Sequence, residues 1–316
     1  MKRWNVLLEY IHYPVCSGRW IRRALDDMEW SARSIGKCTG NDLWGMQFDN
    51  VHLPRLPEPD WTPDVIIVTD GNQEVLRNRN LEEKYPDTPI VVWGLDNAIF
   101  EYNYKQEQRR VDHYFWAHRW PCAFPFSDDE WLPVGFAPHL FSPSPIPWAE
   151  RAHDCAFAGQ MYWGRQILQH RIYRARPIIT ADFCMATPEV MARVYHNARV
   201  SLNWSGAADL SQRVFETLAT GNRIVSDEMP DWYDVMSRWG GEAEDHVVFT
   251  QPSRLENTVR WAAHSSTAIE APTEWLKNHT WEARLRSMFD TLLGKSLIDS
   301  GNAEIDTRQA SSPMLE

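Results

Sequence analysis

Short apolar runs and longer amphipathic stretches alternate along the chain. The apolar runs are rich in β-branched residues and end in Gly, Asp or Asn, a pattern typical of parallel strands that helices cover on both faces. The predicted strands span 4–9, 65–68, 89–93, 154–159, 177–183, 199–203, 223–226 and 247–250. The predicted helices span 19–34, 163–175, 188–198, 212–220, 253–263 and 281–293. This alternation predicts an α/β protein with two Rossmann-like sheets.

A Pro-rich stretch at 138–147 interrupts the alternation and predicts a linker between two domains. A chain of 316 residues also suits two domains better than one core. The predicted organisation is a first domain at 1–137, a linker at 138–150, a second domain at 151–295 and a disordered tail at 296–316. Two such domains form a cleft, and ligands bind there at the turns that follow the strands.

The charge of the chain narrows the range of partners. With 32 basic and 43 acidic residues the net charge is −11, so the basic excess of a sequence-independent nucleic-acid binder is missing. A local basic strip remains at 105–110 with Arg77 and Arg79, and its alternative interpretation is a solvated helix face. The 17 tryptophans suit sugar rings or bases, but they also fill cores.

Neither a membrane span nor a disulfide framework is predicted. No apolar run approaches the ~20 residues that cross a bilayer, and only three apolar residues, 6–8, follow the polar start. The five cysteines are scattered and include no C-x-x-C pair, which argues against a structural zinc site. We therefore expect a cytoplasmic protein with reduced thiols and no integral membrane contact.

The segment 201–227 carries the strongest chemical signal. It is predicted to run from a strand through a loop into a helix, with Ser211 in the capping position. The free N–H groups of the first helical turn form an anion site, and Arg213 adds a fork of donors suited to phosphate. Glu216 lies one turn further, where a carboxylate can accept hydrogen bonds from a vicinal diol such as a ribose. The alternative is that Arg213 and Glu216 form an ordinary surface pair.

Several segments, in order, resemble parts of one glycosyltransferase family. They are 131–136 (WLPVGF) with 141–143 (FSP), 154–159 (DCAFAG) followed by Arg165, 187–203, 213–221 (RVFETLATG) and 279–281 (HTW) with Arg284. The segments resemble the C-terminal domain of family 4-type glycosyltransferases, and more closely their spore-maturation-protein-B-like branch, which has the GT-B fold. The likeness covers about residues 131 to 293. The first half resembles the family only in its general α/β character, and two short segments, 95–97 and 111–115, are weakly similar to it.

The resemblance implies that the second domain holds a nucleotide-sugar donor as co-substrate, with no bound cofactor. Glu216 would bind the donor ribose, and Arg165 and Arg213 its diphosphate. The other donor-site residues implied are Gly159, Asn203 and Ser211. The resemblance also implies metal independence, in agreement with the lack of a D-x-D motif at a strand end. Two positions depart from the family pattern: Ala208, with Asp209 beside it, replaces an acidic residue, and Gln160 replaces a cation.

The first domain must supply the acceptor side. Its candidate residues are His12, Gly18, Asp70, Asn72, Asp96 and His118. We expect the general base to be Asp96 or His118, because either can take the proton of an acceptor hydroxyl. The alternative for each is a turn-forming Asp or a His satisfied in the core.

The function that these observations favour is glycosyl transfer from a nucleotide sugar. One other enzyme class is a GT-B-type nucleotide-sugar epimerase, which needs no separate acceptor. A third class is a non-catalytic two-domain sugar-binding protein, which the lack of a signal-peptide pattern disfavours. The acceptor is open among glycans, lipids, proteins and modified DNA bases. The last would make the protein a DNA-base-modifying glycosyltransferase.

Overall fold

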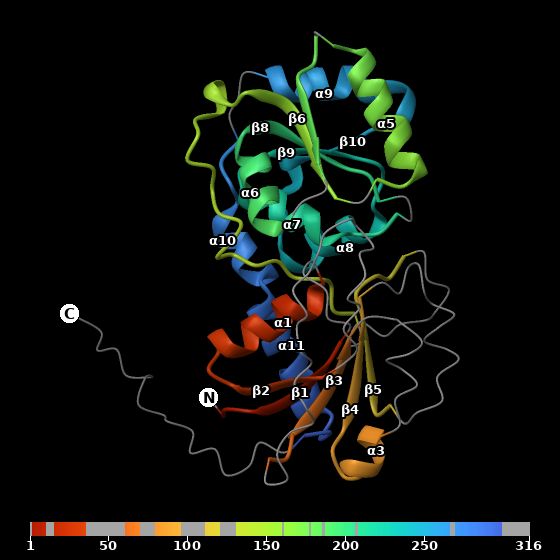
Figure 1. The fold of residues 1–316 in the computed structure, drawn as a ribbon, viewed down its shortest axis with the longest axis vertical. Helices are drawn as coiled ribbons and strands as arrows, with labels where there is room; N and C mark the ends of the chain where they lie inside the picture. Colours follow the sequence, from red (N-terminus) through yellow and green to blue (C-terminus); the bar gives the residue numbers. More distant parts are fainter. Residues whose placement is uncertain are drawn as a thin grey trace, which may run out of the picture.

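Two five-stranded parallel sheets, one in each half of the chain, form the framework of the molecule (Figure 1). In this computed structural model the described residues are 2–10, 16–35, 61–69, 80–95, 111–120, 131–159, 161–176, 178–184, 187–205, 208–265 and 269–298. The predicted α/β class with two Rossmann-like halves is confirmed.

The first sheet has the strand order β2-β1-β3-β4-β5, with every pairing parallel. Its strands are β1 (Asn5–Glu9), β2 (Ser31–Ile35), β3 (Val65–Thr69), β4 (Ile90–Gly94) and β5 (His113–Trp116). Successive residues of β3 face opposite sides: Val65 and Ile67 join the cluster with α1 (Ser17–Asp27), and Ile66 joins the cluster that includes Leu81 of α3 (Asn80–Lys84). Burial on both faces explains the continuous apolar runs.

The second sheet has the strand order β10-β9-β8-β6-β7, again entirely parallel. Its strands are β6 (His153–Ala158), β7 (Ala181–Cys184), β8 (Ala198–Asn203), β9 (Arg223–Ser226) and β10 (Val247–Phe249). The surrounding helices are α5 (Trp163–Arg174), α6 (Pro188–His196), α7 (Gln212–Ala219), α8 (Pro230–Trp239) and α9 (Leu255–His264). Side chains of α6, α7 and α8 share one hydrophobic cluster, whereas α5 and α9 pack on the other face.

The predicted helix at 19–34 is wrong in its second half. The structure ends α1 at Asp27, and Glu29 takes a φ of 58°, which breaks the helix. Ser31–Ile35 then forms β2, which pairs with β1 along its whole length. The sequence pattern did not indicate strand β5 of the first half or helix α8 of the second half.

The last long helix, α11 (Trp281–Gly294), returns to the first half of the molecule. It packs against α1, and the two lie side by side in Figure 1. The Phe289 ring lies 4.5 Å from that of Trp30 and 5.2 Å from that of Trp4. Ile298 is also buried, although we expected a disordered tail from 296 onward. By these contacts 281–298 belongs with the first sheet, unlike the domain boundary predicted at 295.

The Pro-rich segment 138–147 runs along the second half. The Ser144 hydroxyl donates to the His196 carbonyl at 2.8 Å, and its backbone N–H donates to the Thr220 carbonyl at 3.2 Å. A short 3-10 turn, η2 (Trp148–Glu150), then leads into β6. These bonds attach the predicted linker to the ends of α6 and α7.

Among the described residues no helix has the length and apolarity needed to cross a membrane. The described cysteines Cys16, Cys155 and Cys184 are free thiols.

Candidate functional site

The candidate site lies at the carboxyl ends of β6 and β8. These neighbouring strands are where the chain order reverses, since β7 joins one side of β6 and β8 joins the other. Open parallel sheets bind ligands at such a switch point. Gly159 follows β6 with a φ of +146°, a value that strains any residue with a side chain.

Arg213 joins the ends of these two strands from the first turn of α7. Its Nε donates to the Ala158 carbonyl at 2.9 Å, and Nη1 donates to the Asn203 Oδ1 at 3.3 Å. A Cβ at Gly159 would collide with its guanidinium. Gly159 is therefore needed for its conformation and also for the close approach of Arg213.

Arg165 lies beside Arg213, in the first turn of α5. The guanidinium carbons of both residues lie over the Phe157 ring, at 5.1 Å for Arg165 and 4.6 Å for Arg213. Arg165 also lies 4.1 Å above the Tyr162 ring and donates from Nε to the Trp204 carbonyl at 2.8 Å. The two cations come from helices on opposite faces of the sheet, and both lie at the carboxyl ends of its strands.

Burial and a neighbouring like charge both act on Arg165. Burial, and after it the charge of the neighbouring Arg213, lower the pKa of Arg165 to about 10. With this pKa, Arg165 still carries a positive charge at neutral pH. Two adjacent, partly buried cations attract an anion and offer it planar pairs of N–H donors.

Ser211 supports the site in a different way from the one predicted. Its side chain makes no capping bond to α7, although it occupies the N-cap position. Its hydroxyl donates instead to the Asn203 Oδ1 at 2.9 Å, and the Asn203 amide nitrogen donates to the Ser226 hydroxyl at 3.0 Å. Asn203 is thus held between α7 and β9, with its oxygen facing Arg213.

Glu216 is buried, with 5% of its surface exposed, so the alternative of an ordinary surface pair with Arg213 is wrong. The Gln212 amide donates to its Oε1. Burial raises the pKa of Glu216 to about 7, while Arg213 and the Gln212 amide act in the opposite direction. A carboxyl that changes charge near neutral pH responds strongly to any hydroxyl that donates to it.

Two carboxylates near the arginine pair were missed or undervalued by the sequence analysis. Asp209 Oδ1 is buried and makes no hydrogen bond to another described residue, and the Asp209 charge offsets part of the lowering that burial causes in the pKa of Arg165. Asp227, just after β9, accepts from the Ser205 N–H and hydroxyl at 3.0 Å each. The Asp227 charge acts on Arg165 in the same direction. Only the Asp209 position carried a sequence signal, because it follows the departure at Ala208.

On the first half, His118 lies just beyond β5 and is buried. Its Nδ1 lies 3.7 Å from an Oδ of Asp231, in the first turn of α8. The buried Asp231 carboxylate also accepts from the backbone N–H groups of Arg119 and Trp120, each at 3.0 Å. His118 therefore stands where the two halves meet, and Asp231 connects them.

The other acceptor-side candidates are mostly outside the described residues. This applies to Asp96, His12, Asp70 and Asn72. The donor-side departure at Gln160 and the basic strip at 105–110 with Arg77 and Arg79 also lie outside the described residues. Gly18 is described, but it lies inside α1 and not in a turn, and the Tyr10 ring packs where its Cβ would be. Close packing against Tyr10 accounts for this glycine.

The motif near the chain end packs behind the site. The His279 ring stacks on Phe215 of α7, with centroids 4.8 Å apart, and also contacts Trp275. Burial, then the nearby Arg284, lowers the pKa of His279 to about 2. His279 is therefore a neutral packing group that fixes α7, the helix of Arg213 and Glu216.

The part of the chain that the structure describes contains no group of three or more His, Cys, Asp or Glu arranged to hold a metal ion.

No protein-family model matches the sequence, and no curated protein matches it significantly. Among solved structures, the chain is similar to sucrose-phosphate synthase from Thermosynechococcus elongatus, with a TM-score of 0.59 and 12% identity over 93% of this chain and 99% of that one. It is also similar to an α-glucosyltransferase solved with UDP-glucose and DNA containing an abasic site (TM-score 0.56, 10% identity, 92% and 100% coverage). A third is AviGT4, a glycosyltransferase involved in avilamycin A biosynthesis (TM-score 0.55, 13% identity, 93% and 98% coverage).

The chain has the GT-B fold. At these identities the comparisons establish the fold over nearly the whole chain, including the first half, where the sequence resemblance was weak.

Proposed function

We propose that the protein is a glycosyltransferase that moves a sugar from a nucleotide-sugar donor to an acceptor hydroxyl. The observation that carries the proposal is the pair Arg165 and Arg213, which meet over Phe157 at the switch point of the second sheet. A diphosphate is an anion of suitable size and charge for two guanidinium forks. The GT-B fold of the chain and of AviGT4 adds support.

In this proposal the donor lies across the carboxyl edge of the second sheet. Its diphosphate binds Arg165 and Arg213 near the Gly159 backbone, with Asn203 and Ser211 holding Arg213 in place. Its ribose hydroxyls donate to Glu216, which loses its proton more readily once the donor is bound, because hydrogen bonds to the charged form favour that form. We also propose the finer assignment to the family 4-type, spore-maturation-protein-B-like branch, on the motifs quoted above.

The transfer step needs stabilisation of the charge that develops on the leaving diphosphate. The two arginines and the first-turn N–H groups of α7 supply it, so we propose metal-independent transfer with the nucleotide sugar as co-substrate and no resident cofactor. A base on the first half removes the acceptor proton. Asp96 and His118 are our candidates, and for His118 the neighbouring Asp231 carboxylate orients the imidazole.

The test is a thermal-shift panel on the whole protein, with uridine, adenosine and guanosine diphosphates, their sugar conjugates and the free nucleosides. We expect one diphosphate series to raise the Tm and its nucleoside to have a much smaller effect, because a ligand bound only by the folded state stabilises it. Donors that bind are then incubated alone, with glycan, lipid and protein acceptors, and with DNA that contains modified bases. Conversion of the donor sugar without an acceptor would identify an epimerase, and no Tm shift with any diphosphate would refute the proposal.

A further inference from the structure

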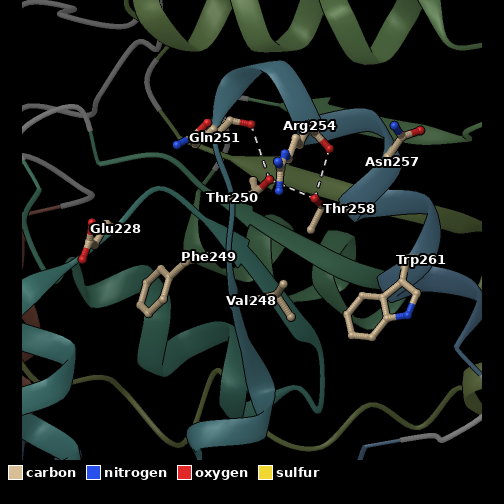
Figure 2. Close-up of a pocket in the computed structure, with 9 residues that line it drawn as sticks. All are labelled: Glu228, Val248, Phe249, Thr250, Gln251, Arg254, Asn257, Thr258 and Trp261. Atoms are coloured by element: carbon tan, nitrogen blue, oxygen red, sulfur yellow. Dashed lines mark hydrogen bonds between the residues drawn. The ribbon is translucent and has the colours of Figure 1, made fainter.

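A pocket opens at the β10 side of the second sheet, away from the arginine pair. It has a volume of about 620 Å³ and lies at the carboxyl end of β10, between that strand and α9 (Figure 2). β10 is an edge strand, separated from β8 by β9. Strands in a sheet lie about 4.8 Å apart, so β10 lies roughly 10 Å from β8.

The pocket contains an exposed aromatic ring that the protein holds in place. Trp261 of α9 is 58% exposed, and Figure 2 shows its indole at the side of the pocket. The Arg223 guanidinium lies 5.5 Å from the ring centre and is itself fixed by a 3.0 Å bond to the Ala262 carbonyl. A large, pre-positioned apolar face suits a ligand that has flat apolar faces of its own.

The rim of the pocket carries polar groups with unused hydrogen-bonding capacity. The side chains of Gln251, Arg254 and Asn257 line it, and none of these three side chains makes a hydrogen bond or ion pair with another described residue. The dashed lines at Gln251 and Arg254 in Figure 2 end on backbone carbonyls, which accept from the Thr250 and Thr258 hydroxyls. By contrast, the Thr250 and Thr258 hydroxyls bond to each other at 2.8 Å and connect α9 to the strand end. The rim is therefore built on a fixed frame, and its amides offer donors and acceptors together.

Among the residues that line the pocket, the charges balance. Arg254 contributes one positive charge and Glu228 one negative charge, so a polyanion has no excess of cations to bind. The amides of Gln251 and Asn257 both donate and accept hydrogen bonds. Ligand hydroxyl groups, which also do both, therefore suit these amides better than phosphate groups, which only accept. Pyranose rings combine such hydroxyls with apolar C–H faces.

We propose that this pocket binds a neutral oligosaccharide, with one sugar ring stacked on Trp261 and its hydroxyls bonded to Gln251 and Asn257. The proposal concerns binding alone and does not need the transfer reaction. The pocket lies at the carboxyl end of β10, roughly two strand spacings from β8. A bound chain of a few sugars can therefore extend along the carboxyl ends of the strands toward the proposed donor site.

The experiment is titration of the whole protein with maltohexaose, cellohexaose and chitohexaose, followed by calorimetry and by ligand-observed NMR. At least one should bind, Trp261→Ala should weaken it about tenfold or more, and Asn257→Ala should also weaken it. Tyr173→Ala, which removes a ring exposed on α5, is the matched control and should bind like the wild type. Thermal unfolding verifies that every variant is folded.

Three results would overturn the proposal. The first is that no oligosaccharide binds, or that one binds equally well to Trp261→Ala. The second is that uridine diphosphate displaces the sugar, which would make the pocket part of a nucleotide site. The third is that a thymidine dodecanucleotide binds here in place of the saccharides, which would indicate a nucleic-acid surface. Saccharide binding without any transferase activity would leave this inference standing and count only against the proposed function.

Discussion

Replacing Glu216 by Gln should stabilise the protein at alkaline pH, with an effect that fades in acid. Burial raises the pKa of Glu216 to about 7, against 4.5 for the free side chain. Between these values the folded protein keeps a proton that the unfolded chain has lost. The free energy of unfolding therefore falls as the pH rises through this window, and the fall ends above the folded pKa.

The size of the effect follows from the same two values. Each pH unit between them corresponds to about 1.4 kcal/mol, so ionised Glu216 lowers the free energy of unfolding by about 3 kcal/mol. Gln has nearly the same shape, can still accept from Gln212 and carries no charge. Glu216→Gln should therefore be about 3 kcal/mol more stable than the wild type at about pH 9, and within about 1 kcal/mol of it at about pH 5.

Urea unfolding, followed by tryptophan fluorescence across this pH range, measures the difference. Glu256→Gln is the control: burial acts to raise the pKa of Glu256, but its hydrogen bonds and the charge of Arg171, 2.8 Å away, outweigh burial and lower the pKa. Its stabilisation is lost only as the pH falls through that lowered pKa, so its difference from the wild type should stay constant over the range. A constant difference for Glu216→Gln as well would mean that Glu216 is ionised throughout, and would refute the reasoning.

The remaining predictions concern the two sides of the cleft. Arg165→Lys and Arg213→Lys should each weaken nucleoside diphosphate binding about tenfold or more but leave nucleoside binding unchanged, because an ammonium lacks the planar fork; calorimetry that finds parental diphosphate affinity in both would place the phosphate site elsewhere. Asp231→Ala should lower the free energy of unfolding by about 2–4 kcal/mol, because two backbone donors lose a charged acceptor, and urea unfolding measures this. Asp96→Asn should lower kcat with little change in donor affinity, whereas full turnover would favour His118 as the base.

Much of the fold could be predicted because it rests on local signals. The apolar runs that became β3 and β4 are buried on both faces, and this is visible in the sequence as unbroken hydrophobicity. The segment 28–35 could not be predicted in the same way. Its apolar positions fit helical and strand periods equally, and pairing with β1, a tertiary contact, selects the strand.

The sequence predicted the cations of the site, but it did not predict the burial of Glu216 or the carboxylates that hold the surrounding backbone. Arg213 and Glu216 were indicated by their place at a helix start, but the sequence left open whether Glu216 is exposed, and only tertiary packing buries it. Asp227 and Asp231 had no signal at all. Their partners are backbone groups 22 and about 110 residues away, and spacing along the chain says nothing of such contacts.

The most direct test of the central claim is a crystal structure of the protein with the nucleoside diphosphate that the thermal-shift panel selects. The account predicts the diphosphate within hydrogen-bonding distance of both Arg165 and Arg213, with a ribose hydroxyl donating to Glu216. A diphosphate bound away from both arginines, or a ribose that leaves Glu216 untouched, would contradict it.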